Sequence, residues 1–133
     1  MLDIYGEELI SRYEHPHEKG KLDNASISMH EENVSCGDTI TIYLKIKDDR
    51  VEDAKFDGNG CIISMGSADL LLEEIKGKSL SEIEKMGKED LFKIIGIEPG
   101  PARLHCATLS LRALKKAVLA FENKEVDRET KEL

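Results

Sequence analysis

The sequence predicts an α+β fold: a three-stranded antiparallel sheet with helices packed on one face, an N-terminal helix and a long C-terminal helix. Two observations lead to this expectation. Between residues 25 and 56, apolar residues alternate with polar ones in successive segments, as they do in half-buried strands. From Leu104 to Phe121, apolar residues instead recur every three or four positions, as on one face of an amphipathic helix. The 133 residues suit a single domain, which we expect to span 1–133.

The first helix is expected over residues 2–14, where apolar side chains are spaced by three and four positions: Leu2, Tyr5, Leu9 and Tyr13. It ends at the His15-Pro16-His17 segment, because proline disfavours helical geometry in the residue before it. Three strands of an antiparallel meander follow, over 25–29, 39–47 and 51–56, with a turn at Asp48-Asp49.

The remaining elements are helical. A largely buried helix is expected over 61–75, after a Gly58-Asn59-Gly60 breaker, and two short helices near 79–86 and 88–95. Ser79 and Glu82 have the spacing of a capping box. A Pro99-Gly100-Pro101 link leads into the long C-terminal helix, and the charged tail, about 122–133, is expected to fray.

Composition excludes several classes of function. The chain has 27 acidic and 19 basic residues and a net charge of −8, which disfavours binding to nucleic acid. No apolar run approaches the roughly 18 residues of a membrane helix, and the N-terminus has no basic region followed by an apolar stretch. We therefore expect no membrane partner and a cytoplasmic location, where three cysteines stay reduced.

Each of the three cysteines lies at the end of a predicted element. Cys36 occupies a turn between the first two strands, whereas Cys61 and Cys106 open helices. Helix N-termini favour negative charge, so Cys61 and Cys106 are expected to ionise more readily than a free cysteine. Three unrelated cysteines are the plain alternative. The position of all three beside glycine or proline instead favours one shared site at an end of the sheet.

A shared site of this kind would hold a soft metal. Thiolates select iron-sulfur clusters, zinc or copper, and a four-ligand site needs one donor beyond three sulfurs. Asp38 and His105 are the two candidates. Neighbouring residues of a helix diverge by about 100°, so His105 and Cys106 can both be ligands only where the helix is irregular. A carboxylate is a harder donor than sulfur and would hold a cluster loosely. A Cys-His protease is disfavoured, because His105 is poorly placed to act as the base for its neighbour Cys106.

Four segments together resemble the IscU-type (NifU N-terminal-like) iron-sulfur cluster assembly scaffolds, over about Tyr5 to Phe121. They are Tyr13-Glu14-His15-Pro16-His17, Val34-Ser35-Cys36-Gly37-Asp38, Gly58-Asn59-Gly60-Cys61-Ile62-Ile63-Ser64 and Arg103-Leu104-His105-Cys106-Ala107. Each segment is a weak signal alone. Three cysteine segments in this order and at these intervals are highly specific.

The resemblance implies a scaffold and not an enzyme. A cysteine desulfurase supplies persulfide sulfur, iron is added, and a 2Fe-2S cluster forms before transfer to recipient apoproteins or carrier proteins. Cys36, Cys61 and Cys106 resemble the three thiols of the family, Asp38 the aspartate that makes the cluster labile, and His105 an additional ligand. Cys36, on a turn that can move without unpacking the core, is our candidate for the first persulfide acceptor. One chain could complete the site, or a homodimer could share a cluster.

Two segments depart from the bacterial scaffolds. The bacterial scaffolds carry a Leu-Pro-Pro-Val-Lys segment for a dedicated Hsp70-type chaperone, and this chain has residues 97–103 in its place. A chaperone partner of this type is therefore doubtful. The block Gly60–Met65 looks closer to SufU-type relatives, which resemble zinc-containing sulfur acceptors. A zinc-containing sulfurtransferase is therefore the alternative function, with zinc in the isolated protein. His105 and the compact interval of 45 residues between Cys61 and Cys106 favour the scaffold.

Overall fold

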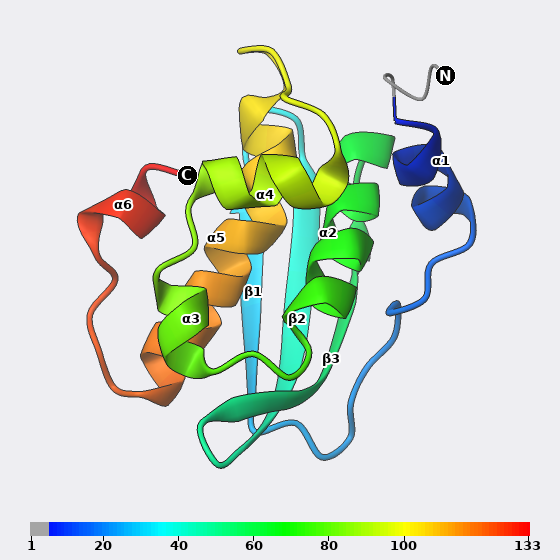
Figure 1. Cartoon of the computed structure of the whole chain (residues 1–133). Coiled ribbons are helices and arrows are strands. Elements are labelled where there is room, and N and C mark those ends of the chain that lie inside the picture. The colour runs from blue at the N-terminus through cyan, green and yellow to red at the C-terminus, as the bar shows by residue number, and fades with distance from the viewer. Residues whose placement is uncertain (1–5) are drawn as a thin grey trace.

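The computed structural model describes residues 6–133 and contains one three-stranded sheet (Figure 1). Its strands, β1 (Ile27–Asn33), β2 (Asp38–Lys47) and β3 (Arg50–Asn59), pair antiparallel in the order β1-β2-β3. Asp48 and Asp49, between β2 and β3, both have positive φ angles, as a tight hairpin turn requires. The predicted meander is confirmed, but β3 extends to Asn59 and so includes two residues of the expected Gly58-Asn59-Gly60 breaker.

Six helices complete the described chain: α1 (Glu7–Glu14), α2 (Ile62–Ile75), α3 (Leu80–Glu84), α4 (Lys88–Ile95), α5 (Leu104–Phe121) and α6 (Arg128–Lys131). Helices α2 and α5 cover one face of the sheet, and α1 packs against α2 (Figure 1). Ser79 and Glu82 form the predicted capping box at the start of α3. The predicted α+β fold with its long C-terminal helix is thus confirmed. The expected contributions of Leu2 and Tyr5 to the first helix lie outside the described residues.

The core lies between the sheet and these two helices. Alternate residues of β2, namely Ile40, Ile42 and Leu44, are fully buried and face α2 and α5. Fully burying one such side chain stabilises the fold by about 1.5–3 kcal/mol. Leu71 of α2 and Leu114 of α5 are also fully buried in this cluster. The alternation that the sequence displays therefore decides which face of the sheet carries the helices.

Strand β1 is longer than predicted. It continues beyond Met29 to Asn33, because its pairing with β2 persists through Glu31↔Ile40 to Asn33↔Asp38. The apolar alternation stops at Glu31, yet the Glu31 carboxylate lies 2.8 Å from the Lys116 ammonium on α5. An ion pair replaces an apolar contact there, so hydrophobic pattern alone misses the end of the strand.

The charged tail does not fray as expected. It forms α6, whose first turn is capped by Asp127 through the Thr130 N–H at 2.8 Å. Leu133 is only 6% exposed and joins the hydrophobic core. The Glu129 carboxylate lies 3.9 Å from the buried Lys115 ammonium, which also donates to the Met86 carbonyl at 2.6 Å. Charge pairing and one apolar contact, which composition does not reveal, hold the tail in place.

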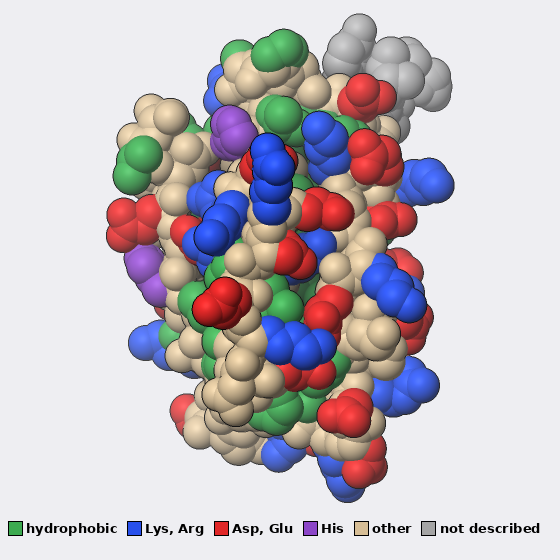
Figure 2. All heavy atoms as spheres, turned by 90° about the vertical axis from the view of Figure 1, so that its left-hand side faces the viewer, with side chains coloured by type: hydrophobic (Ala, Val, Ile, Leu, Met, Phe, Trp, Pro, Cys, Tyr) green, Lys and Arg blue, Asp and Glu red, His purple; other side chains and the backbone are tan. Residues whose placement is uncertain are grey.

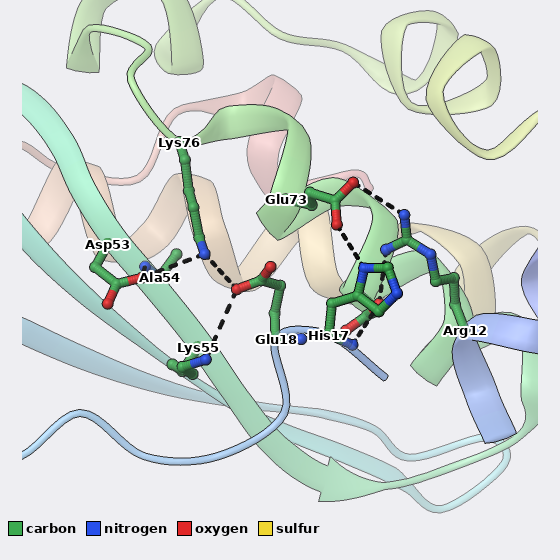
Figure 3. Close-up of polar contacts among 9 residues, drawn as sticks. Arg12, His17, Glu18, Asp53, Ala54, Lys55, Glu73 and Lys76 are labelled. Atoms are coloured by element: carbon green, nitrogen blue, oxygen red, sulfur yellow. Dashed lines mark hydrogen bonds and ion pairs between the residues drawn. The ribbon is translucent and has the colours of Figure 1, made fainter. Parts of the chain in front are cut away.

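Helix α1 is tied to α2 by a buried polar cluster (Figure 3). The Asp69 carboxylate, fully buried on α2, accepts from the Arg12 guanidinium at 2.8 Å and from the N–H groups of His17 and Glu18 at 3.1 and 2.7 Å. Glu73 accepts a second hydrogen bond from Arg12 and contacts His17. The hydrogen bond from Arg12, together with that from His17, lowers the pKa of Glu73. This contact therefore supports the fold at neutral pH and is lost on acidification.

No helix among the described residues is long and apolar enough to cross a membrane. The face that lies at the left of Figure 1 carries acidic and basic side chains interspersed with one another (Figure 2). This face has no continuous basic surface of the kind that binds a phosphate backbone.

Candidate metal centre

Cys36 lies on the turn that joins β1 to β2, at the upper end of the sheet in Figure 1. The main-chain carbonyl of Asn33 accepts from the N–H groups of Gly37 and Cys36 at 2.8 and 3.3 Å. Gly37 has a φ of +77°, a conformation that side chains other than glycine rarely adopt. The turn leaves Cys36 exposed and places Asp38 at the first position of β2.

Cys61 caps the N-terminus of α2. Its sulfur accepts from the main-chain N–H of Ser64 at 3.4 Å, and the Ser64 hydroxyl donates to the Cys61 carbonyl at 3.1 Å. A Cβ on Gly60 would lie 2.4 Å from the Ser64 hydroxyl and 3.0 Å from the Asp38 carboxyl carbon. Only glycine therefore leaves room for Asp38 beside Cys61.

Cys106 lies in the first turn of α5 and is 3% exposed. Its sulfur is 3.6 Å from the Cys36 sulfur, while the Cys61 sulfur is 3.7 Å from an Asp38 carboxylate oxygen. The ligand atoms of Cys36, Asp38 and Cys106 all lie within 4.8 Å of one another. In residues 6–133 no other group of three cysteine, histidine or acidic side chains is so arranged. The three elements thus bring three thiols and one carboxylate together.

This donor set suits a tetrahedral metal ion or an iron of a cluster. With metal-sulfur bonds of about 2.3 Å, two sulfurs of a tetrahedral site are separated by about 3.8 Å. The observed 3.6 Å between Cys36 and Cys106 is close to that value. Three sulfurs and one oxygen also match the softness of zinc and iron. The residues present therefore fit a metal without rearrangement of the fold.

Cys106 does not ionise readily, contrary to the expectation from its helix position. Burial, together with the adjacent Cys36 and Cys61, raises the pKa of its thiol to about 12. A helix N-terminus favours a thiolate by a modest amount, whereas desolvation and two neighbouring thiols oppose it more strongly. A bound metal would displace this proton and remove the penalty.

The metal-free protein should therefore alkylate in a fixed order. We expect iodoacetamide at pH 8 to label Cys36 fastest and Cys106 slowest, by at least about tenfold, since only the exposed thiolate reacts. Mass spectrometry of quenched time points measures the three rates. Denatured protein, in which the three cysteines should react alike, is the control. Equal rates in the folded chain would contradict the burial assigned to Cys106.

His105 lies apart from this group. It is exposed, and its Nδ1 is 3.3 Å from the main-chain oxygen of Leu133. Helix α5 is already regular from Leu104, so His105 and Cys106 point in directions about 100° apart. The structure brings Cys36, Asp38, Cys61 and Cys106 together and directs His105 toward the tail.

Two further residues contact the thiols without having been predicted as site residues. Ser64 stands three residues after Cys61, the spacing at which a helix cap accepts its hydrogen bond, and this signal could have identified it. Asn33 donates from its side-chain nitrogen toward the Cys106 sulfur at 3.9 Å. Asn33 and Cys106 are 73 positions apart, so no local pattern predicts this contact.

Comparison with protein families gives one match that spans nearly the whole chain. Residues 4–128 match the family described as the NifU-like N terminal domain. This chain belongs to that family. The NifU-like N-terminal assignment confirms the resemblance that the four sequence segments indicated, and the segments that supply the gathered thiols all lie inside the matched range.

Relatives of this NifU-like domain include proteins named SufU and proteins named IscU. The zinc-dependent sulfurtransferase SufU of Bacillus subtilis is 39% identical, over 90% of this chain and 92% of its own length. The iron-sulfur cluster assembly scaffold protein IscU of Thermotoga maritima is 38% identical, over 86% and 92%. The crystal structure of FiSufU from Fervidobacterium islandicum, described as a candidate scaffold for the SUF system, superposes with a TM-score of 0.74 at 27% identity. It covers 86% of this chain and 96% of FiSufU. The SufU and IscU relatives are thus about equally identical in sequence to this chain.

Proposed function

We propose that this protein is a scaffold on which 2Fe-2S clusters are assembled, with sulfur from a cysteine desulfurase, and from which they pass to recipient apoproteins. The observation that carries the proposal is the gathering of Cys36, Cys61, Cys106 and Asp38 at one end of the sheet. In this role the chain is not an enzyme, because the cluster is its cargo. Thiols that must stay reduced to bind iron suit the cytoplasm.

The four side chains have different roles in this proposal. Cys36 is exposed on a turn, so it can meet a persulfide carried by another protein. Its thiolate attacks the outer sulfur, a Cys36 persulfide forms, and the thiolate of the desulfurase leaves. Cys61 and Cys106, fixed at the starts of helices, hold iron with Asp38. Asp38 supplies a hard oxygen donor, which suits a cluster that must be released.

A zinc-containing sulfurtransferase is the second candidate. The 39% identity to the Bacillus subtilis SufU favours it, and the same three sulfurs and one oxygen are a suitable donor set for zinc. The interval of 45 residues between Cys61 and Cys106 supports the scaffold instead. Both candidates accept sulfur from a desulfurase, so the bound metal distinguishes them.

Anaerobic purification followed by iron, sulfide and zinc analysis tests the proposal. We expect reconstitution with iron and sulfide to yield the visible absorption of a 2Fe-2S cluster that moves to an apo-ferredoxin. Stoichiometric zinc that survives reconstitution, combined with stimulation of a desulfurase, would establish the sulfurtransferase instead. The Cys36→Ser variant controls for sulfur acceptance in either assay.

Asp38→Ala should slow the loss of a bound cluster several-fold. The substitution removes a hard, exchangeable oxygen, and softer ligands or a bridging partner then hold the iron. Transfer of the cluster to an apo-ferredoxin, followed by absorbance or circular dichroism, measures the rate. Asp23→Ala, at an exposed loop position, is the matched control. Unchanged or faster release from the Asp38 variant would show that the carboxylate does not make the cluster labile.

A further inference from the structure

We propose that Asn33 is a positioning residue of the metal centre, whose side-chain amide donates a hydrogen bond to the Cys106 sulfur when that sulfur binds metal. The inference rests on the proposed function only in that Cys106 is a ligand. It applies equally to iron and to zinc, because both convert the thiol to a thiolate.

Asn33 contacts three parts of the site: Asp38, the Cys36 turn and Cys106. It is the last residue of β1, pairs with Asp38 across the sheet, and is 8% exposed. Its main-chain carbonyl closes the turn that presents Cys36. The same residue thus fixes the Cys36 turn with its backbone and reaches Cys106 with its side chain.

Hydrogen bonding decides which end of the Asn33 amide faces the sulfur. Oδ1 can only accept, and it accepts from the main-chain N–H of Ser35 at 3.3 Å. Nδ2, the donor end, must therefore lie on the other side, where it is 3.9 Å from the Cys106 sulfur. A flipped amide would place the Ser35 N–H against a second donor. The local network alone thus assigns the orientation.

A hydrogen-bond donor beside the Cys106 sulfur would stabilise the thiolates when metal is bound. The Cys36 and Cys106 sulfurs are 3.6 Å apart, so two neighbouring thiolates would concentrate negative charge in a partly buried place. An N–H directed at one sulfur stabilises that charge and lowers the energy of the sulfur lone pairs. Cys61 receives such a donor from its own helix, through the Ser64 N–H at 3.4 Å. For Cys106 the donor comes from the side chain of β1.

Two substitutions and a matched control test the inference with cobalt(II) as the metal probe. Asn33→Asp keeps the oxygen that accepts from Ser35 and loses the donor, whereas Asn33→Leu removes both without adding charge. In each variant we expect the thiolate-to-cobalt charge-transfer band to shift to lower energy, because the sulfur lone pairs rise. Asn24→Asp, an exposed loop substitution of the same chemistry, should leave the band in place. Far-ultraviolet circular dichroism verifies that each variant folds.

A second measurement needs no substitution and decides the question if the variants fail to fold. In wild-type protein loaded with the NMR-active cadmium isotope, a side-chain amide proton of Asn33 should show scalar coupling to cadmium through the Cys106 sulfur. A missing coupling, or charge-transfer bands that do not move in folded Asn33 variants, would overturn the inference alone. A wild-type chain that shows no thiolate bands with cobalt would overturn the proposed function as well, which separates the two failures.

Discussion

Cys106→Ser should abolish metal binding, the largest functional effect that we expect from a single substitution. Cys106 is fixed in the first turn of α5 with 3% exposure, and its sulfur lies between the Cys36 turn and the Asn33 amide. A serine hydroxyl is a harder and weaker donor. Affinity should fall by more than the roughly 100-fold that loss of an outer-shell partner causes. Competition with a chromophoric zinc chelator measures this loss, and Cys61→Ser should behave alike.

Cys36→Ser is the matched comparison. Its exposed turn can change without disturbing the core, so this variant should keep the fold and part of its metal binding but no longer accept sulfur. Mass spectrometry after incubation with a desulfurase and cysteine locates the persulfide. Persulfide on Cys106, with Cys36→Ser still accepting sulfur, would refute the acceptor role of Cys36 and leave the scaffold proposal standing. Full metal affinity in Cys106→Ser would refute the metal centre itself.

Asp69→Ala should cause the largest loss of stability, roughly 3–5 kcal/mol, the usual cost of breaking a buried ion pair. Asp69 is fully buried and accepts from the Arg12 guanidinium and two main-chain N–H groups. Its removal leaves three donors without that acceptor and weakens the attachment of α1 to α2, of which the bond from Arg12 to Glu73 remains. Urea unfolding followed by circular dichroism measures the difference in free energy of unfolding.

Glu73→Ala provides the control within the same cluster. Its side chain is 45% exposed and binds the other end of Arg12, so its removal should cost no more than about 1 kcal/mol. Similar losses for the two variants would show that burial of Asp69 is not what makes its contacts strong. A loss below about 1 kcal/mol for Asp69→Ala would contradict the role assigned to the cluster.

Local pattern predicted most of the fold, and its failures have a common cause. The periods of two and of three to four identified all three strands and the helices α2 and α5, because each period reflects which side chains face the core, whereas helix start signals such as the Ser79 and Glu82 capping box identified the short helices α3 and α4. Pattern stopped short in β1, where Glu31 pairs with Lys116 of α5, and in the tail, where Glu129 meets Lys115. Distant partners stabilise these charged residues, and a sequence does not reveal such partners.

The features of the candidate metal centre also divide into those that local sequence predicts and those that depend on distant contacts. Sequence by itself determined that the three cysteines and Asp38 stand at the ends of strands and helices, near glycine or proline, since turn chemistry is local. Only the tertiary structure decided that Cys106 is buried with a raised pKa, that His105 turns toward Leu133, and that Asn33 reaches Cys106. Solvent exposure and contacts between distant segments exist only once the chain has folded. For Cys106, burial affects the pKa of the thiol more strongly than its position at a helix start does.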